Sequence, residues 1–472
     1  MNFKIVAAME GQDVDSQVIG ADDTEAAELT QAVADVNQAD SENSGLQQSI
    51  AVAAEDADEL DNIQAVADAS LVPQAEGGSS GEGLSPEAAQ LAQVSVESIS
   101  RRLGIFGTTG IPSAEGFGSK NSRAAATRLA SESIWSKLKQ IWKAIVAAFK
   151  NMWTKLKAFV RSIFGGAERL QARAEKMLAK VNETKGAKEN DTFKNASIAK
   201  AFSVGGKFDA KKVSELVKNH REVASSAIAY INGQASVAKK FKADYLDKKL
   251  TGGAKAGVAF QGLVDQVDAD YKGFSEVTSA GDLKKMGFDP KSGGDDKKVT
   301  VLVGPSLINE TAFAIEKTME KDQGSDNAHD MIGTAKFSKV SISKSSTDTE
   351  FDELELGVAD TGTLASICRD VIEISKTLIA FKAVEGKTAE SEKVFDELFK
   401  SLDTILDKKI TASKAKTDDE KDEARAAFSV ARRFSSAMSN CAQTATSAIP
   451  AFSLSAGNLA LNYVASSVAS YR

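Results

Sequence analysis

The clearest pattern of apolar and polar positions in the chain lies between Ser131 and Phe164. Apolar side chains recur there every seven residues, and a second set follows three residues after the first, over more than four heptads. This spacing places them on one face of a long amphipathic helix. The apolar stripe is Trp135, Leu138, Trp142, Ile145, Phe149, Met152, Leu156, Phe159 and Ile163. The pair Gly165-Gly166 predicts the end of this helix.

Helical spacing also dominates the chain after residue 165, with one interruption. Lys298–Gly304 is a short β-branched run, and Phe337–Ser343 and Phe351–Leu356 alternate apolar with polar residues. These runs predict a small sheet with one face covered by helices. The helices expected after it are Leu364–Val384, Glu390–Ile410, Asp418–Ser447 and Ser453–Tyr471. The predicted fold class is mainly α with a small antiparallel β patch (α+β).

The first 115 residues show weaker patterns. Ala21–Asn37 and Ile50–Ala69 are rich in Ala, Glu, Asp and Val at loosely helical spacing. Ser85 followed by Pro86 favours the start of a third helix, with serine as the N-cap. Glycines and serines at 77–81 predict a flexible joint between these pieces. We therefore expect this region to be loosely helical or partly disordered.

Charge divides the chain near residue 115. Residues 1–115 contain 21 acidic and three basic residues, a net charge of -18. Residues 116–472 contain 55 basic and 45 acidic residues, a net charge of +10, so the whole chain is at -8. Because like charges repel, the N-terminal region can order itself only in part. Two interpretations stay open: a solubilising acidic tail, or a segment that screens the basic body.

The positive charge of the body is concentrated in residues 116–164, which hold ten basic residues and one acidic residue. On the predicted helix these side chains lie opposite the apolar stripe. The basic helix face is Lys137, Lys139, Lys143, Lys150, Lys155, Lys157 and Arg161. Three interpretations are open: a packing helix with a solvated lysine face, a helix at a membrane surface, and an electrostatic docking site for phosphate or for the acidic region.

Residues suited to catalysis are few. The chain has two histidines, His220 and His329, and two cysteines, Cys368 and Cys441. We expect His220 on a helix surface, His329 in a loop and both cysteines in the core. No phosphate-binding loop, paired C-x-x-C or nucleophile motif occurs, and no apolar run could span a membrane. We predict no enzyme activity, catalytic residue, cofactor or metal site; an enzyme inhibited by its acidic region is the remaining alternative of that class.

A candidate processing site coincides with the charge boundary, at Ser113, Ala114, Glu115 and Gly116. The surrounding segment, 103–120, is rich in glycine, and we expect it to be exposed and extended, as a protease requires. A glutamate after small residues suits a protease pocket that contains a basic group. The same small-x-Glu pattern ends at Glu10, Glu28, Glu55, Glu82, Glu97 and Glu168. Most of these lie in expected helices, so location selects Glu115, with Glu82 the next most exposed.

These features together resemble a known family. An acidic N-terminal propeptide ending in small-x-Glu, then a helix rich in tryptophan and lysine, then a helical body, is similar to the internal head (inner body) proteins of giant tailed bacteriophages. The resemblance is architectural over roughly residues 1–180. It implies a virion structural protein that is cut after Glu115 by a prohead protease and stays inside the phage head with the genome, after assembly in the host cytoplasm.

The partners that the resemblance implies are the prohead protease, other capsid or inner-head proteins, and packaged DNA bound without sequence specificity. The chief alternative function is a membrane-active protein, such as a toxin or an ejected factor that helps a phage enter its host, with the 131–164 helix at a bilayer interface. The segments expected are an acidic propeptide (1–115), an exposed linker (116–130), the basic amphipathic helix (131–164), a helical region (165–290), a small β region (291–360) and a C-terminal helical bundle (361–472).

Overall fold

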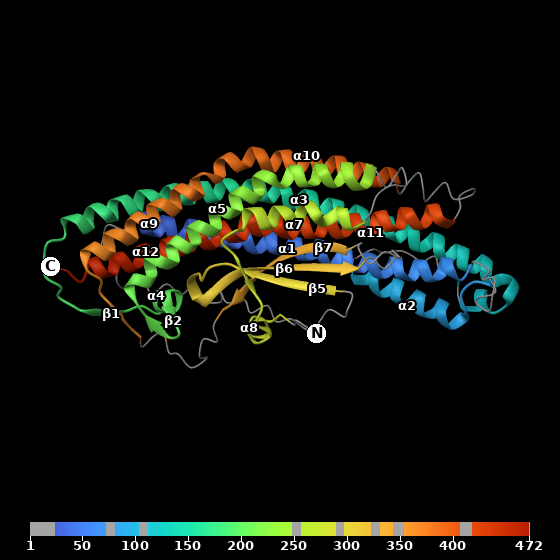
Figure 1. The fold of residues 1–472 in the computed structure, drawn as a ribbon, viewed down its shortest axis with the longest axis horizontal. Coiled ribbons are helices and arrows are strands. Elements are labelled where there is room, and N and C mark those ends of the chain that lie inside the picture. The colour runs from blue at the N-terminus through green and yellow to red at the C-terminus, as the bar shows by residue number, and fades with distance from the viewer. Residues whose placement is uncertain are drawn as a thin grey trace.

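The computed structural model describes most of the chain and shows an elongated bundle of long helices with a small sheet on one side (Figure 1). The described residues are 24–71, 81–102, 112, 114–247, 256–288, 297–321, 331–342, 351, 354–405 and 418–471. The helices are α1 (Thr24–Ala69), α2 (Pro86–Arg102), α3 (Lys120–Glu183), α4 (Ala196–Phe202), α5 (Ala210–Phe241), α7 (Ala256–Asp270), α8 (Ala280–Lys285), α9 (Thr361–Ile379), α10 (Phe381–Ile405), α11 (Asp418–Gln443) and α12 (Ile449–Val468). The short turns are η1 (Ala114–Phe117), η2 (Lys242–Leu246), η3 (Ile308–Glu310) and η5 (Thr444–Ala448).

The strands form three small antiparallel sheets, which confirms the predicted fold class. They are β1 (Thr192–Lys194), β2 (Ser203–Val204), β3 (Lys207–Phe208), β4 (Ser275–Val277), β5 (Lys297–Val303), β6 (Thr311–Lys321), β7 (Met331–Ser341) and β8 (Glu355–Gly357). The largest sheet has the order β4-β5-β6-β7. Strands β5 and β7 overlap two of the three predicted runs and belong to this sheet. The third run, Phe351–Leu356, overlaps β8, which pairs with β1 in a separate sheet. Strand β6 was not predicted, because its alternation is broken by alanine, lysine and glutamate.

The helix α3 is longer than predicted at both ends. It begins at Lys120, where Ser119 accepts a hydrogen bond from the Ser122 backbone N–H, so most of the expected linker 116–130 is helical. It also continues through Gly165 and Gly166, which were expected to end it. The reason is packing against α12: a Cβ on Gly166 would lie 2.9 Å from Cδ2 of Leu454. The glycine allows this close approach, and the burial gained offsets a helix-propensity cost of about 1 kcal/mol.

The acidic N-terminal region contains one continuous 46-residue helix, α1, in place of the two short helices predicted there. Leu29, Ile50 and Leu60 on this helix are fully buried, and α1 packs along α3, α11 and α12. The polar stretch around residues 37–49 looked like a break in the apolar pattern. In the structure two of its polar side chains bond to the body, since Ser447 bonds to both Asp40 and Asn43. This part of the acidic region is therefore built into the body.

One hydrophobic cluster includes side chains of helices from α1 to α12. Cys368 and Cys441 are buried in it, as predicted. His220 is also buried, so its predicted position on the surface was wrong. Its sequence neighbours are polar, but residues one turn away on α5, such as Leu216 and Val223, are buried, and helical periodicity places His220 with them. His329 lies outside the described residues.

Candidate functional site

The predicted cleavage segment is a single turn between α2 and α3. Residues Ala114–Phe117 form the 3-10 helix η1, which the Gly118 N–H closes by donating to the Glu115 carbonyl at 3.1 Å. The Glu115 side chain is exposed and Gly116 is half-buried, whereas Ser113 lies outside the described residues. The sequence predicted an extended segment here, so the structure corrects that prediction for residues 114–117.

The turn has a physical cause in its last residue. Phe117 is fully buried in the hydrophobic core, which draws the chain inward two residues after the exposed Glu115. Arg123 on the first turns of α3 donates from Nε to the Phe117 carbonyl at 2.8 Å and fixes this position. The candidate site is thus an exposed glutamate held beside a buried anchor. The turn that a protease has to open is four residues long.

Two of the small-x-Glu glutamates that the structure describes lie outside α-helices, Glu115 and Glu82. Glu82 is half-buried, with its carboxylate 4.0 Å from Nη1 of Arg123. The remaining described ones are Glu28 and Glu55 in α1, Glu97 in α2 and Glu168 in α3. Each helical glutamate is surrounded by i→i−4 backbone hydrogen bonds that cleavage would have to break. Of these described candidates, Glu115 is the one that combines an exposed side chain with a place outside the α-helices.

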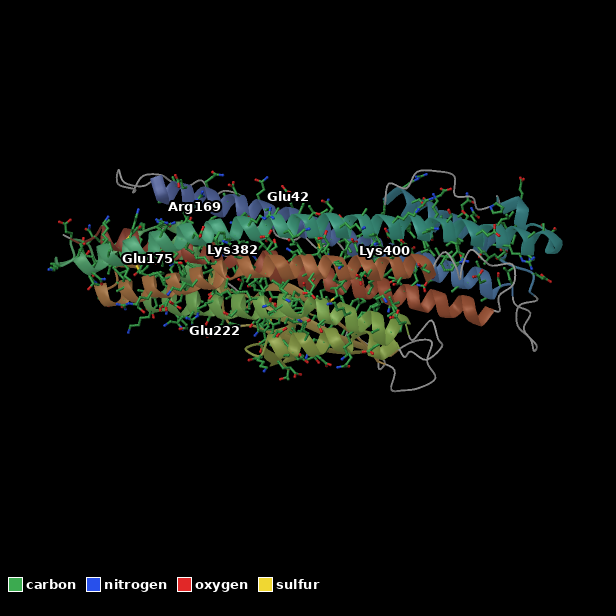
Figure 2. The ribbon with its side chains drawn as sticks, turned by 90° about the horizontal axis from the view of Figure 1, so that it is seen from above. Glu42, Arg169, Glu175, Glu222, Lys382 and Lys400 are labelled. Carbon is green, nitrogen blue, oxygen red and sulfur yellow. The ribbon has the colours of Figure 1, made fainter. Side chains whose placement is uncertain are left out.

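The basic face of α3 contacts acidic residues of α10. Lys150 lies 3.1 Å from Asp396, Lys157 lies 2.6 Å from Glu392, and Arg161 donates to Glu385 at 2.8 Å from Nε. The residue numbers rise along α3 and fall along α10, so the two helices pair antiparallel, as they lie in Figure 2. The interpretation as a packing helix left the lysine face solvated, and this part of it does not hold for these three side chains. The row of acidic residues at 385, 392 and 396 was the signal that could have shown it.

The remaining basic residues of the face have different surroundings. Lys155 points to the other side of α3 and lies 2.8 Å from Glu42 of α1, whose label stands on the side of α3 away from α10 in Figure 2. This hydrogen bond lowers the pKa of the Glu42 carboxyl. Lys137 is buried, Lys139 is half-buried, and Lys143 is exposed. The face is therefore divided between α10, α1 and solvent.

The apolar stripe of α3 is a packing surface. Every one of its nine residues is buried except Trp135, which is half-buried. The aromatic members meet side chains of α10, with ring centroids 5.4 Å apart for Trp142 and Phe399 and 4.8 Å for Phe149 and Phe395. The Trp142 indole N–H also donates to Asp403 at 2.9 Å. In this conformation the stripe offers no free apolar face to a bilayer, and no helix in the described part of the chain is long and apolar enough to cross one.

A buried ion pair joins the acidic helix to α11. The Arg432 side chain is fully buried, and its Nη2 lies 2.8 Å from Asp58 and 3.8 Å from Asp61, both on α1. Its guanidinium carbon lies 4.4 Å from the centroid of the Phe428 ring. Next to it the more exposed Arg433 also reaches Asp58, at 3.4 Å. No local pattern in the sequence predicts this cluster, because its partners come from opposite ends of the chain.

A second polar contact lies nearer the start of α1. Asp40 accepts hydrogen bonds from Ser447 at 2.7 Å and from Gln443 at 3.1 Å. Burial raises the pKa of the Asp40 carboxyl, and the hydrogen bond from Ser447 acts against that rise. Burial lowers the pKa of Lys339 on β7, and the charge of Asp40 raises it. The carboxylate of the acidic helix is thus a counter-charge for a lysine of the body.

The buried nucleophilic and titratable groups are unsuited to acid–base or nucleophilic chemistry. Burial lowers the pKa of His220 to about 3, with a smaller contribution from Lys339, and raises the pKa of Cys368 and of Cys441 to about 12. The His220 Nε2 accepts a hydrogen bond from the Ile308 N–H at 3.3 Å, a structural use of the ring. Among the described residues, no group of acidic, histidine or cysteine side chains could hold a metal ion.

Comparison with known protein families shows which family the chain belongs to. The sequence matches the family described as phiKZ-like phage internal head proteins over residues 18–466. The chain belongs to this family. The match extends from the acidic helix α1 into α12, so it includes both the acidic region and the body. No curated protein and no solved structure matches.

The internal head protein therefore has a structural role in the virion, and its place is inside the phage head. Membership in the family implies association with other capsid proteins. The resemblance seen in the sequence is confirmed, and it extends over far more of the chain than residues 1–180. The alternative of a membrane-active protein has no support from the family or from the buried stripe.

Proposed function

We propose that this internal head protein is matured by cleavage after Glu115 and is packaged with the genome. The observation that carries the proposal is the position of Glu115. Its side chain is exposed, in a four-residue turn outside the α-helices, at the point where the charge of the chain changes sign. Cleavage there separates a segment at -18 from a body of 357 residues at +10.

The turn is well suited to recognition by a protease. Opening η1 breaks a few backbone hydrogen bonds, among them the one from Gly118 to Glu115, and each of them contributes about 1 kcal/mol net. Extending the chain around Glu168 would break several backbone bonds in the middle of α3 and disturb the buried Ala167 and Leu170. The same tripeptide pattern is therefore far more accessible at Glu115.

Contact with packaged DNA follows from the charge of the body. The ten basic residues concentrated in 116–164 attract a polyanion without sequence specificity, and such binding weakens as salt rises. Three cations of the basic face are paired with α10, so they contribute less than the sequence indicates. Exposed Lys143 is the member of the face that DNA would meet, because Lys155 is paired with Glu42 of α1.

Two phage variants test the cleavage. Glu115→Gln removes the charge that the protease pocket reads, while Glu168→Gln makes the same change in a tripeptide inside α3. We expect particles with Glu115→Gln to contain the uncut protein, and particles with Glu168→Gln to contain the cut form. Immunoblots of purified particles with an antibody against the body distinguish these outcomes. Normal cutting of Glu115→Gln would refute cleavage at this residue.

A further inference from the structure

We propose that a cut after Glu115 does not by itself release the acidic segment: helix α1 stays docked in the groove between α3, α11 and α12, and the product is a two-chain protein. This inference rests on the proposed cleavage after Glu115 and concerns its structural consequence. It makes the groove a binding site with a defined occupant, an acidic helix of this same chain, anchored on the buried Arg432.

Apolar burial along α1 supports docking after the cut. Leu29, Val36, Ile50 and Leu60 are buried over nearly the whole length of the helix, against α3, α11 and α12. Burial of apolar side chains is the main favourable contribution to protein association. The cut lies in η1, outside all of these contacts, so it removes none of them.

The second helix of the acidic segment, α2, is also attached to α1 and to the body. Arg102 at the end of α2 lies 2.6 Å from Asp56 of α1, so the two helices are tied to each other. The Leu84 backbone N–H donates to Thr127 Oγ1 of α3 at 2.9 Å, and Val96 and Ile99 of α2 are buried. The described part of the acidic segment thus contacts the body at both of its helices.

Arg432 gives the groove its selectivity for an acidic occupant. This side chain is fully buried in the body, and the carboxylates at 2.8 and 3.8 Å belong to Asp58 and Asp61 of α1. A helix without those charges would leave a buried cation uncompensated, which is strongly unfavourable. Asp40, bonded to Gln443 and Ser447, fixes the register at a second place.

The exposed contact between Glu42 and Lys155 provides a matched control. Its side chains are about half accessible, at 51% and 39%, whereas the Arg432 side chain is at 0%. Exposed ion pairs contribute little to stability and are screened by salt. The carboxylates of both contacts, Glu42 and Asp58, lie on α1. Changing each of them to an amide therefore distinguishes the loss of the buried ion pair from a general effect of the charge of α1.

The docking test uses the full chain with the recognition sequence of a site-specific protease inserted between Glu115 and Gly116. After complete cutting, size-exclusion chromatography and native mass spectrometry are run in 0.15 M and 1 M NaCl. We expect the two fragments to elute together under both conditions and to separate in denaturant. Separate elution of the N-terminal fragment in 0.15 M NaCl would overturn the proposal.

The anchor is tested by the release rate of a fluorescently labelled N-terminal fragment, chased by an excess of unlabelled fragment. Asp58→Asn with Asp61→Asn should speed release by about a hundredfold or more, and Glu42→Gln by no more than about threefold. Adding Arg432→Met to the double variant should restore slow release, since no buried charge then lacks a partner. Circular dichroism of the uncut variants shows whether each one folds. Equal release of the double variant and Glu42→Gln would contradict the anchor.

The docking result does not depend on the phage protease, because the cut is introduced by another enzyme. If the protein in particles proves to be uncut, the proposed maturation fails while the docking measurement keeps its meaning. If the engineered cut releases the segment, docking fails while maturation after Glu115 stands.

Discussion

His220 illustrates how far single residues could be predicted from the sequence. The polar neighbours Lys218 and Arg221 suggested a surface position, but the side chain is buried between the η3 turn and α12. Helical periodicity carried the correct signal, since buried Leu216 and Val217 stand four and three residues before it. The burial of Arg432 had no such local signal, because its partners Asp58 and Asp61 are remote in sequence.

The buried histidine predicts a stability that depends on pH. His220 has a pKa of about 3 in the folded protein against 6.5 for an ordinary histidine, because burial disfavours the charged ring. Between pH 3 and pH 6.5 the unfolded state binds more protons at His220 than the folded state does. The free energy of unfolding is therefore unaffected by this group above pH 6.5 and decreases as pH falls toward 3. The slope is at most about 1.4 kcal/mol per pH unit.

Urea unfolding between pH 7.5 and 4.5 measures this slope, with His220→Gln as the comparison. Glutamine does not titrate, so the free energy of unfolding of the variant should fall less steeply with decreasing pH. The groups around the ring, Lys339, Ser453 and the Ile308 N–H, are the same in both proteins. Equal slopes would show that His220 does not make this contribution.

At the level of elements, the existence of helices was easier to predict than their ends. The heptad stripe of 131–164 identified the central part of α3, because a spacing maintained over more than four heptads leaves little ambiguity. Its C-terminal end was wrong, since Gly165 and Gly166 stop a helix only when no tertiary contact favours its continuation. The contact at Gly166 comes from Leu454, which local sequence does not show.

These two adjacent glycines give a prediction of opposite effects. A Cβ on Gly165 meets nothing within 4 Å, so Gly165→Ala should raise the free energy of unfolding by about 0.5–1 kcal/mol through helix propensity. A Cβ on Gly166 would lie 2.9 Å from the buried Leu454, and overpacking costs about 1–3 kcal/mol. Gly166→Ala should therefore be the less stable of the two variants. Thermal unfolding compares them, and equal stability would contradict the close approach of α3 to α12.

At the level of the whole molecule, the sequence shows that charge is divided between the N-terminal region and the body. It does not show which basic residues of the body the acidic region contacts. One of the two interpretations of the acidic region was that it screens the basic body. In the structure α1 reaches the basic face of α3 at Lys155, while α10 pairs with Lys150, Lys157 and Arg161. The buried carboxylate contacts of α1 are instead with α11 and with the segment after it, at Arg432 and Ser447. Sequence alone could not assign these partners, because opposite charges on several helices allow many pairings.

The N-terminal sequence of the protein taken from purified particles tests the central claim, that the acidic segment is cut from the body after Glu115. Edman degradation, or labelling of free amino termini before digestion and mass spectrometry, identifies the first residues directly. The account predicts a chain that begins Gly116-Phe117-Gly118-Ser119-Lys120. A body that is still continuous with residues before Glu115 in mature particles would contradict it.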